Sequence, residues 1–81
     1  MRYFSTSQFE RDFKKLSPAV RLVFQKQIEL LLNDIRHPSL HAKKYGGAKD
    51  VWQARVNQNI RLYFLIRGDV YILLNIRKHS D

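Results

Sequence analysis

The second half of the chain contains side chains that bind phosphate. Arg55, Arg61 and Arg77 fall in three separate β-prone runs, and Lys78 and His79 follow the last of them. The planar guanidinium of arginine matches phosphate oxygens in pairs, and fixed cations stabilise the charge that grows on a phosphodiester as it is cleaved. RNA brings its own nucleophile, the 2′-hydroxyl, so a protein that cleaves it needs to supply only a base, an acid and charge stabilisation. These residue types therefore predict phosphate binding, and they include the groups that RNA cleavage requires.

His79 is the candidate for proton transfer at such a site. An unperturbed imidazole titrates near pH ~6.5, and this one directly follows the basic end of the last run. The alternative proton-transfer groups are Lys43, Lys44 and Lys78. A histidine near a chain end is more often an ordinary surface residue, and arginines on one face of an antiparallel sheet are often simply solvated.

The other histidines and the aromatic residues have plainer interpretations. His37 suits the C-terminus of a helix, and His41 lies in a polar loop with no partner at metal-ligand spacing, so we predict no metal or cofactor. Trp52 is expected in the core. Tyr63 and Tyr71 fit base stacking and cross-strand packing equally well.

Composition indicates one small basic domain, residues 1–81. The net charge is +8, and it is uneven, with six basic against four acidic residues in 1–35 and nine against three in 36–81. Such an excess favours a polyanionic partner through counterion release. There is no cysteine, which excludes thiolate metal sites and thiol nucleophiles and fits a reducing compartment, so the cytoplasm is expected. We see neither a membrane-spanning apolar run nor a signal peptide.

Two helices are predicted after a short strand at Arg2 to Phe4. Ser7 and Glu10 have the spacing of a capping box at the start of the first helix. The second helix starts at Ser17-Pro18 and should end near His37, before a proline. Apolar residues recur at helical spacing along both, so they form a hairpin whose apolar face needs another layer.

Three strands in a meander supply that layer, after a basic loop at residues 38–50. They span 51–56, 60–66 and 70–77, and two turn-forming segments separate them. Alternation divides them into two faces. The face expected on the helices holds Trp52, Ala54, Val56, Ile60, Leu62, Phe64, Ile66, Val70, Ile72, Leu74 and Ile76. The opposite face holds Gln53, Arg55, Arg61, Tyr63, Leu65, Tyr71, Leu73, Asn75 and Arg77. Because the middle strand borders both neighbours, the three arginines should converge near one end of this face. The predicted fold class is α+β, with a helix hairpin packed on an antiparallel sheet in the order β-α-α-β-β-β.

This order of elements resembles the RelE/ParE toxin superfamily, in particular its RelE-like branch. The resemblance spans essentially the whole chain. It is carried by HPSL (37–40), KKYGG (43–47), VWQARV (51–56), NIRLYF (59–64) and ILLNIRKHSD (72–81).

The resemblance implies a toxin of a type II toxin–antitoxin system. Such a toxin is an endoribonuclease that cleaves messenger RNA, often on the ribosome, and a cognate antitoxin that wraps it keeps it silent. It implies that Arg61 stabilises the scissile phosphate, that His79 transfers a proton and that Arg55 belongs to the basic surface that grips RNA. We predict that Arg55 also helps Arg61 to stabilise phosphate charge. The remaining RNA-binding residues are expected to be Lys43, Lys44, Lys49, Tyr63, Arg77 and Lys78.

Two alternatives stay open. One is a ParE-like toxin, which inhibits DNA gyrase through protein contacts without catalysis. The other is a toxin that has kept only its binding to the antitoxin. The Lys43-Lys44 loop and the pairing of Arg61 with His79 favour RNA cleavage over the ParE-like alternative.

Overall fold

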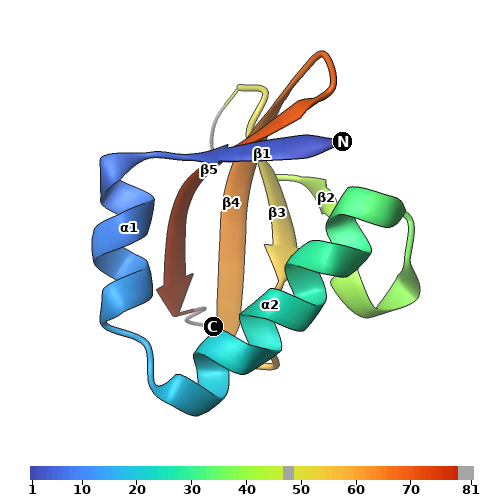
Figure 1. Cartoon of the computed structure of the whole chain (residues 1–81). Helices are drawn as coiled ribbons and strands as arrows, with labels where there is room; N and C mark the ends of the chain where they lie inside the picture. Colours follow the sequence, from blue (N-terminus) through green and yellow to red (C-terminus); the bar gives the residue numbers. More distant parts are fainter. Residues whose placement is uncertain (47–48, 79–81) are drawn as a thin grey trace.

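In the computed structural model, which describes residues 1–46 and 49–78, two helices lie on one face of a five-stranded sheet (Figure 1). The elements are β1 (Arg2–Ser5), α1 (Ser7–Lys14), α2 (Pro18–Asn33), β2 (Lys43–Lys44), β3 (Trp52–Arg55), β4 (Ile60–Arg67) and β5 (Val70–Lys78). A 3-10 turn, Pro38–Leu40, lies between α2 and β2. The α+β class and the order of the predicted elements are confirmed, and β2 is an additional short strand within the predicted basic loop.

The sheet is mixed, with its strands in the order β1-β5-β4-β3-β2. β3, β4 and β5 form the predicted antiparallel meander, and β2 joins β3 in antiparallel pairing. β1 pairs with β5 in parallel, which differs from the all-antiparallel sheet expected from the sequence. β5, the last strand of the described residues, therefore lies inside the sheet, between β1 and β4 (Figure 1).

Thr6 caps α1, one residue ahead of the predicted cap. Its side chain accepts a hydrogen bond from the N–H of Phe9 at 3.1 Å. The prediction of Ser7 is wrong because Ser7 is already the first residue of the helix. Glu10, whose spacing suggested Ser7, accepts a hydrogen bond from the hydroxyl of Ser5 at 2.8 Å instead.

α2 begins as predicted and ends earlier than predicted. Ser17 caps it and Pro18 occupies its first position, where a missing N–H costs no hydrogen bond. The helix stops at Asn33 because Asp34 is extended and its carboxylate accepts the N–H of Arg36 at 2.9 Å, which starts a turn. Neither helix in residues 1–46 has the length and apolar character to cross a bilayer.

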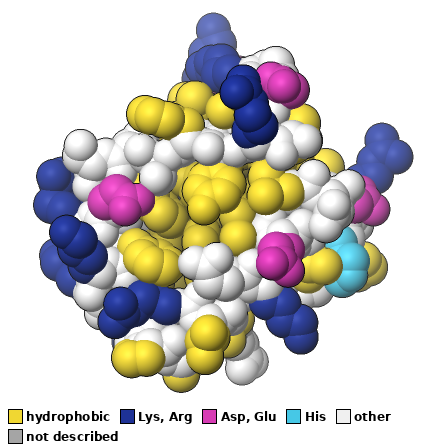
Figure 2. Space-filling model, in the orientation of Figure 1, with side chains coloured by type: hydrophobic (Ala, Val, Ile, Leu, Met, Phe, Trp, Pro, Cys, Tyr) yellow, Lys and Arg dark blue, Asp and Glu magenta, His cyan; other side chains and the backbone are white. Residues whose placement is uncertain are grey.

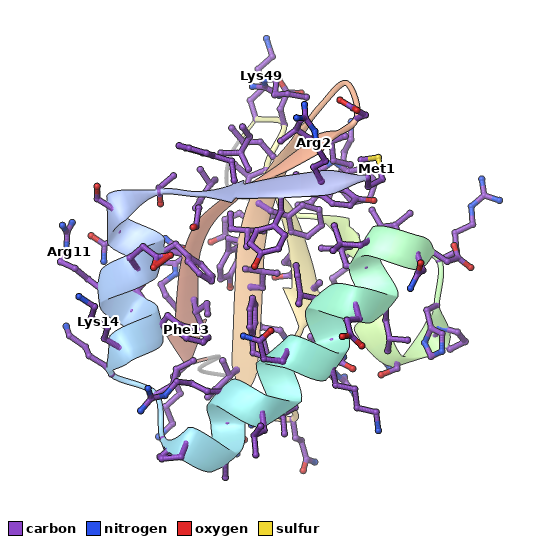
Figure 3. The ribbon with its side chains drawn as sticks, viewed as in Figure 1. Met1, Arg2, Arg11, Phe13, Lys14 and Lys49 are labelled. Atoms are coloured by element: carbon purple, nitrogen blue, oxygen red, sulfur yellow. The ribbon has the colours of Figure 1, made fainter. Side chains whose placement is uncertain are left out.

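Side chains from both layers form the core. Phe9 of α1 and Phe24 of α2 pack with ring centroids 5.5 Å apart. Phe64 is fully buried at the middle of β4, and Trp52 stacks on it at 6.4 Å, so Trp52 packs against the core as predicted. Phe13 points from α1 toward the sheet (Figure 3). On the helix-bearing side, apolar side chains gather at the centre and most lysines and arginines lie around the edge (Figure 2).

One extra residue interrupts the alternation of β5. Tyr63 pairs with Asn75, but the next residue of β4, Phe64, pairs with Leu73, so Leu74 has no partner and forms a β-bulge. After the bulge, the strand follows the predicted faces. Before it, every side chain faces the side opposite to the predicted one.

The first half of β5 therefore corrects the prediction of the faces. Tyr71 and Leu73 are buried in the core, at 4% and 0% exposure, instead of lying on the far side of the sheet. Val70 and Ile72 take the opposite side, beside Arg67 and Leu65 of β4. A pattern of period 2 carries no sign of a bulged residue, so the reversal has no signature in the sequence.

Candidate nucleic-acid interface

Three arginines lie side by side on the open face, which we define as the face of the sheet away from the helices. Arg61 of β4 pairs with Arg55 of β3 on one side and with Arg77 of β5 on the other. The Cβ atoms of residues paired in this way lie about 4.5–5.5 Å apart, so the three side chains form one arginine row, as the sequence predicted. Like charges placed opposite each other destabilise a sheet, and the row therefore favours an anionic ligand that offsets their repulsion.

The arginine row borders a hollow of about 340 Å³, which we call the arginine hollow. β2 forms its other wall, because Lys43 pairs with Gln53 and therefore faces the same side as Arg55. The residues that line it are His41, Ala42, Lys43, Gln53, Arg55 and Arg61. Arginine and lysine supply its formal charges and no carboxylate lines it, so it is suited to a phosphate group.

Arg61 is held in place by the hairpin that joins β3 to β4. Its Nη1 donates to the carbonyl oxygens of Asn57 at 2.7 Å, Gln58 at 3.2 Å and Ile60 at 3.3 Å. Among the described residues, Nη1 makes all the side-chain hydrogen bonds of Arg61. The guanidinium is thus fixed by one nitrogen, and its other nitrogens remain to bind a ligand.

The backbone of Arg55 is hydrogen-bonded to a side chain of α2. The side-chain amide of Gln27 donates to the carbonyl oxygen of Arg55 at 2.9 Å and to that of Ser39 at 3.3 Å. The Ser39 hydroxyl in turn donates to Gln27 Oε1 at 3.1 Å. Gln27 therefore joins α2, the 3-10 turn and β3. Arg55 Nε is buried and has no hydrogen-bond partner within residues 1–46 and 49–78, so its hydrogen bonding is incomplete in the free protein.

Arg77 rests on an aromatic pair. Its guanidinium carbon lies 4.5 Å from the centre of the Tyr63 ring, and the ring of Tyr45 meets Tyr63 edge-on at 5.2 Å. This cation–π contact orients Arg77 and leaves Tyr63 only 7% exposed. Of the two interpretations of Tyr63, the geometry favours cross-strand packing over stacking on an RNA base.

Comparisons with known proteins identify the fold. No family model and no curated protein matches the sequence. Solved structures match over nearly the whole chain. The YoeB/ParE toxin from Agrobacterium tumefaciens superposes with a TM-score of 0.81 at 13% identity, over 99% of this chain and 100% of that one. YafQ from E. coli gives a TM-score of 0.80 at 15% identity, over 95% and 91%.

A third match is the RelB–RelE antitoxin–toxin complex from Methanococcus jannaschii. It has a TM-score of 0.76 at 21% identity, over 93% of this chain and 88% of that one. The chain has the fold of the RelE/ParE toxin superfamily. These structural neighbours include a toxin described without a partner, from Agrobacterium tumefaciens, and an antitoxin–toxin complex, from Methanococcus jannaschii.

The RelE/ParE-type sheet divides the predicted RNA-binding lysines between its two faces. Lys43 lies on the open face, at the arginine hollow. Lys44 pairs with Trp52 and Lys78 pairs with Ile60, so both are directed to the side of the sheet that carries the helices. The register therefore brings Lys43 to the arginines and separates Lys44 and Lys78 from them.

One further predicted residue, Lys49, is not part of this arrangement. Lys49 precedes β3 and lies at the end of the RelE/ParE-type sheet where that strand begins, whereas the arginine row lies where β3 ends (Figure 3). His79 lies outside the described residues.

His41 is the residue of the hollow that sequence reasoning undervalued. It has a left-handed backbone, with φ of 46°, at the end of the 3-10 turn, and it lines the same hollow as Arg55 and Arg61. The sequence carries no signal for this position, because the alternation of an extended chain does not apply to a residue with a left-handed backbone after a 3-10 turn.

Proposed function

We propose that this chain is the toxin of a type II toxin–antitoxin system and acts as a metal-independent endoribonuclease on messenger RNA. The observation that carries the proposal is the arginine row at the edge of a cationic hollow. Among the described residues, the one side-chain ion pair joins Arg2 to Asp69, at the other end of the sheet. No carboxylate of the described residues therefore neutralises the arginine row. Unneutralised, ordered arginines are what a phosphodiester requires.

The proposed reaction uses the 2′-hydroxyl of RNA as nucleophile. A base removes the proton of that hydroxyl, its oxygen attacks the adjacent phosphorus, and an acid protonates the departing 5′-oxygen. The products are a 2′,3′-cyclic phosphate and a 5′-hydroxyl end. Arg55 and Arg61 stabilise the negative charge that grows on the phosphate oxygens, and Arg77 and Lys43 position the strand. His79 and His41 supply the proton-transfer groups.

The proposed partners are a cognate antitoxin and the translating ribosome, in the cytoplasm. Support for an antitoxin comes from neighbours solved as complexes, namely RelB with RelE and DinJ with YafQ. The excess of positive charge, +8 over the chain, supports a nucleic-acid substrate.

The test is cleavage of single-stranded RNA by the purified chain and by Arg61→Lys. Lysine keeps one donor for the hairpin carbonyls but loses the planar fork, so the fold should persist while cleavage falls by about a hundredfold. Arg67→Lys is the matched control, because Arg67 is exposed at the far end of the same strand. The readouts are the rate of 2′,3′-cyclic phosphate formation and the melting temperature.

Equal rates for Arg61→Lys and the control would remove Arg61 from the reaction. If the parent arrests growth without producing new RNA ends and alters DNA supercoiling, the gyrase alternative replaces this proposal. Normal growth on induction of soluble, folded protein would favour the alternative that retains antitoxin binding alone.

A further inference from the structure

A second hollow, of about 600 Å³, adjoins the arginine hollow. It lies between α2, the segment around the 3-10 turn, and the end of β3, and we call it the loop hollow. Arg55 and His41 line both hollows, so these two residues form the boundary between them. A chain that places one phosphate at Arg55 can therefore continue directly into the loop hollow.

The loop hollow combines an apolar wall with hydrogen-bond donors. Val23 and Leu30 of α2 and Val56 after β3 form the wall. Val23 is 40% exposed, so part of this wall is open to a ligand. An apolar wall can contact the face of a nucleobase, and the volume lies within the usual range for small-ligand sites, about 300–1,000 Å³.

The donors of the loop hollow are Lys26, Asn57 and His37. Asn57 Oδ1 accepts the backbone N–H groups of Asn59 and Ile60, each at 2.8 Å, so its amide nitrogen is the atom that remains for a ligand. His37 Nδ1 accepts the N–H of Ser39 at 3.2 Å, which assigns the imidazole proton to Nε2. Gln27 is already engaged with Ser39 and Arg55 and serves as a fixed part of the wall.

We propose that the loop hollow binds the nucleotide next to the scissile phosphate, with the base against the apolar wall and its phosphate at Lys26. The choice of RNA as ligand rests on the proposed function. It is supported by the shared boundary at Arg55 and His41 and by the absence of carboxylates among the residues that line either hollow. A nucleotide bound there extends the contact of the substrate from one phosphate to two.

The test measures binding of a 2′-fluoro tetranucleotide, which lacks the nucleophilic hydroxyl and cannot be cleaved. Lys26→Glu is compared with Lys14→Glu, which changes the net charge equally. Lys14 points outward from α1, and no residue of that helix lines either hollow (Figure 3). We expect Lys26→Glu to bind about tenfold more weakly than the control, because reversal of a charge at a phosphate contact replaces attraction with repulsion.

The outcomes separate the two proposals. If both variants weaken binding equally, the loop hollow is not an RNA site, whatever the result of the cleavage test. If binding depends on Lys26 but ordinary RNA is not cleaved, the loop hollow is an RNA-binding site and the proposed cleavage activity is wrong. In NMR spectra of the parent, the tetranucleotide should shift the side-chain amide of Asn57. Shifts there on adding the antitoxin, with none on adding RNA, would assign the hollow to the protein partner and overturn the inference.

Discussion

Gln27 is the residue through which the helix layer reaches the candidate site. It is only 9% exposed, and its amide joins the carbonyl oxygens of Ser39 and Arg55. Replacing it with alanine leaves these groups without their partner, and we expect a loss of about 1–3 kcal/mol of unfolding free energy. Urea unfolding measures the loss.

The matched control for this prediction is Gln25→Ala. Gln25 is an exposed residue of the same helix, and its replacement should change stability by less than about 0.5 kcal/mol. Similar losses for the two variants would mean that the Gln27 hydrogen bonds contribute no more to stability than an exposed glutamine does. A further decrease in cleavage rate for Gln27→Ala, with the protein still folded, would show that the position of Arg55 matters.

At the level of single residues, sequence predicted what alternation can reveal. Arg55 and Arg61 are neighbours because the hairpin between β3 and β4 sets their register, whereas Arg77 lies opposite Arg61 because the bulge at Leu74 shifts the register of β5 by one residue. Gln27 was beyond such reasoning, because a polar residue on a helix carries no sign of the loop that its amide will contact. His41 was undervalued for a related reason, since it follows a 3-10 turn that sequence patterns do not indicate.

The start of α1 is hydrogen-bonded to β5. Thr6 caps the helix, and its hydroxyl donates to the carbonyl oxygen of Leu74, the bulged residue, at 2.8 Å. Its backbone N–H donates to the carbonyl oxygen of Leu73 at 3.1 Å. Further along α1, Asp12 accepts the N–H of Ile76 at 3.1 Å, where β5 extends beyond β1. Thr6 and Asp12 thus provide the hydrogen bonds that a neighbouring strand would otherwise make with this part of β5.

We expect Thr6→Ala to cost about 1–2 kcal/mol, because it removes both the cap and the bond to the bulge. Ser7→Ala is the control, since Ser7 is exposed within the first turn, and it should cost less than about 0.5 kcal/mol. Denaturant unfolding of the two variants checks the prediction. The reverse order of losses would restore Ser7 as the cap.

At the level of elements, periodic patterns predicted the helices and the meander, and short or irregular features escaped them. β2 has only two residues, too few for alternation to be recognised. The parallel pairing of β1 with β5 depends on contacts between residues far apart in the sequence. The bulge at Leu74 is one residue in an apolar run, and the residues that hydrogen-bond to it and to Ile76, Thr6 and Asp12, are far away in the sequence.

At the level of the whole molecule, Tyr71 links stability to alkaline pH. Burial in the core raises the pKa of its hydroxyl above the ordinary value, and the negative charge of Asp34 raises this pKa further. The folded state therefore holds the proton more tightly than the unfolded state. The resulting stabilisation of the folded state is fully present below the ordinary tyrosine pKa of about 10. It is lost as the pH rises through the higher pKa that Tyr71 has in the folded state.

We expect Tyr71→Phe to reduce this loss, because phenylalanine keeps the edge-on contact with Phe64 and has no proton to release. Urea midpoints at about pH 8 and pH 10.5 measure the effect. Tyr3→Phe is the control, since Tyr3 is exposed on β1. Lysine deprotonation affects all three proteins alike. If the urea midpoint falls equally between the two pH values in the parent and in Tyr71→Phe, Tyr71 is not the source of the loss of stability.

The position of β5 inside the sheet has a consequence for the order of events during synthesis. β1 pairs with β5, which is made after β1 and after the strands between them in the sequence, and the arginine row takes one member from β5. A nascent chain that has not yet released β5 has neither a partner for β1 nor a complete arginine row. Under the proposed activity, the protein cannot damage the message from which it is translated until β5 has left the ribosome.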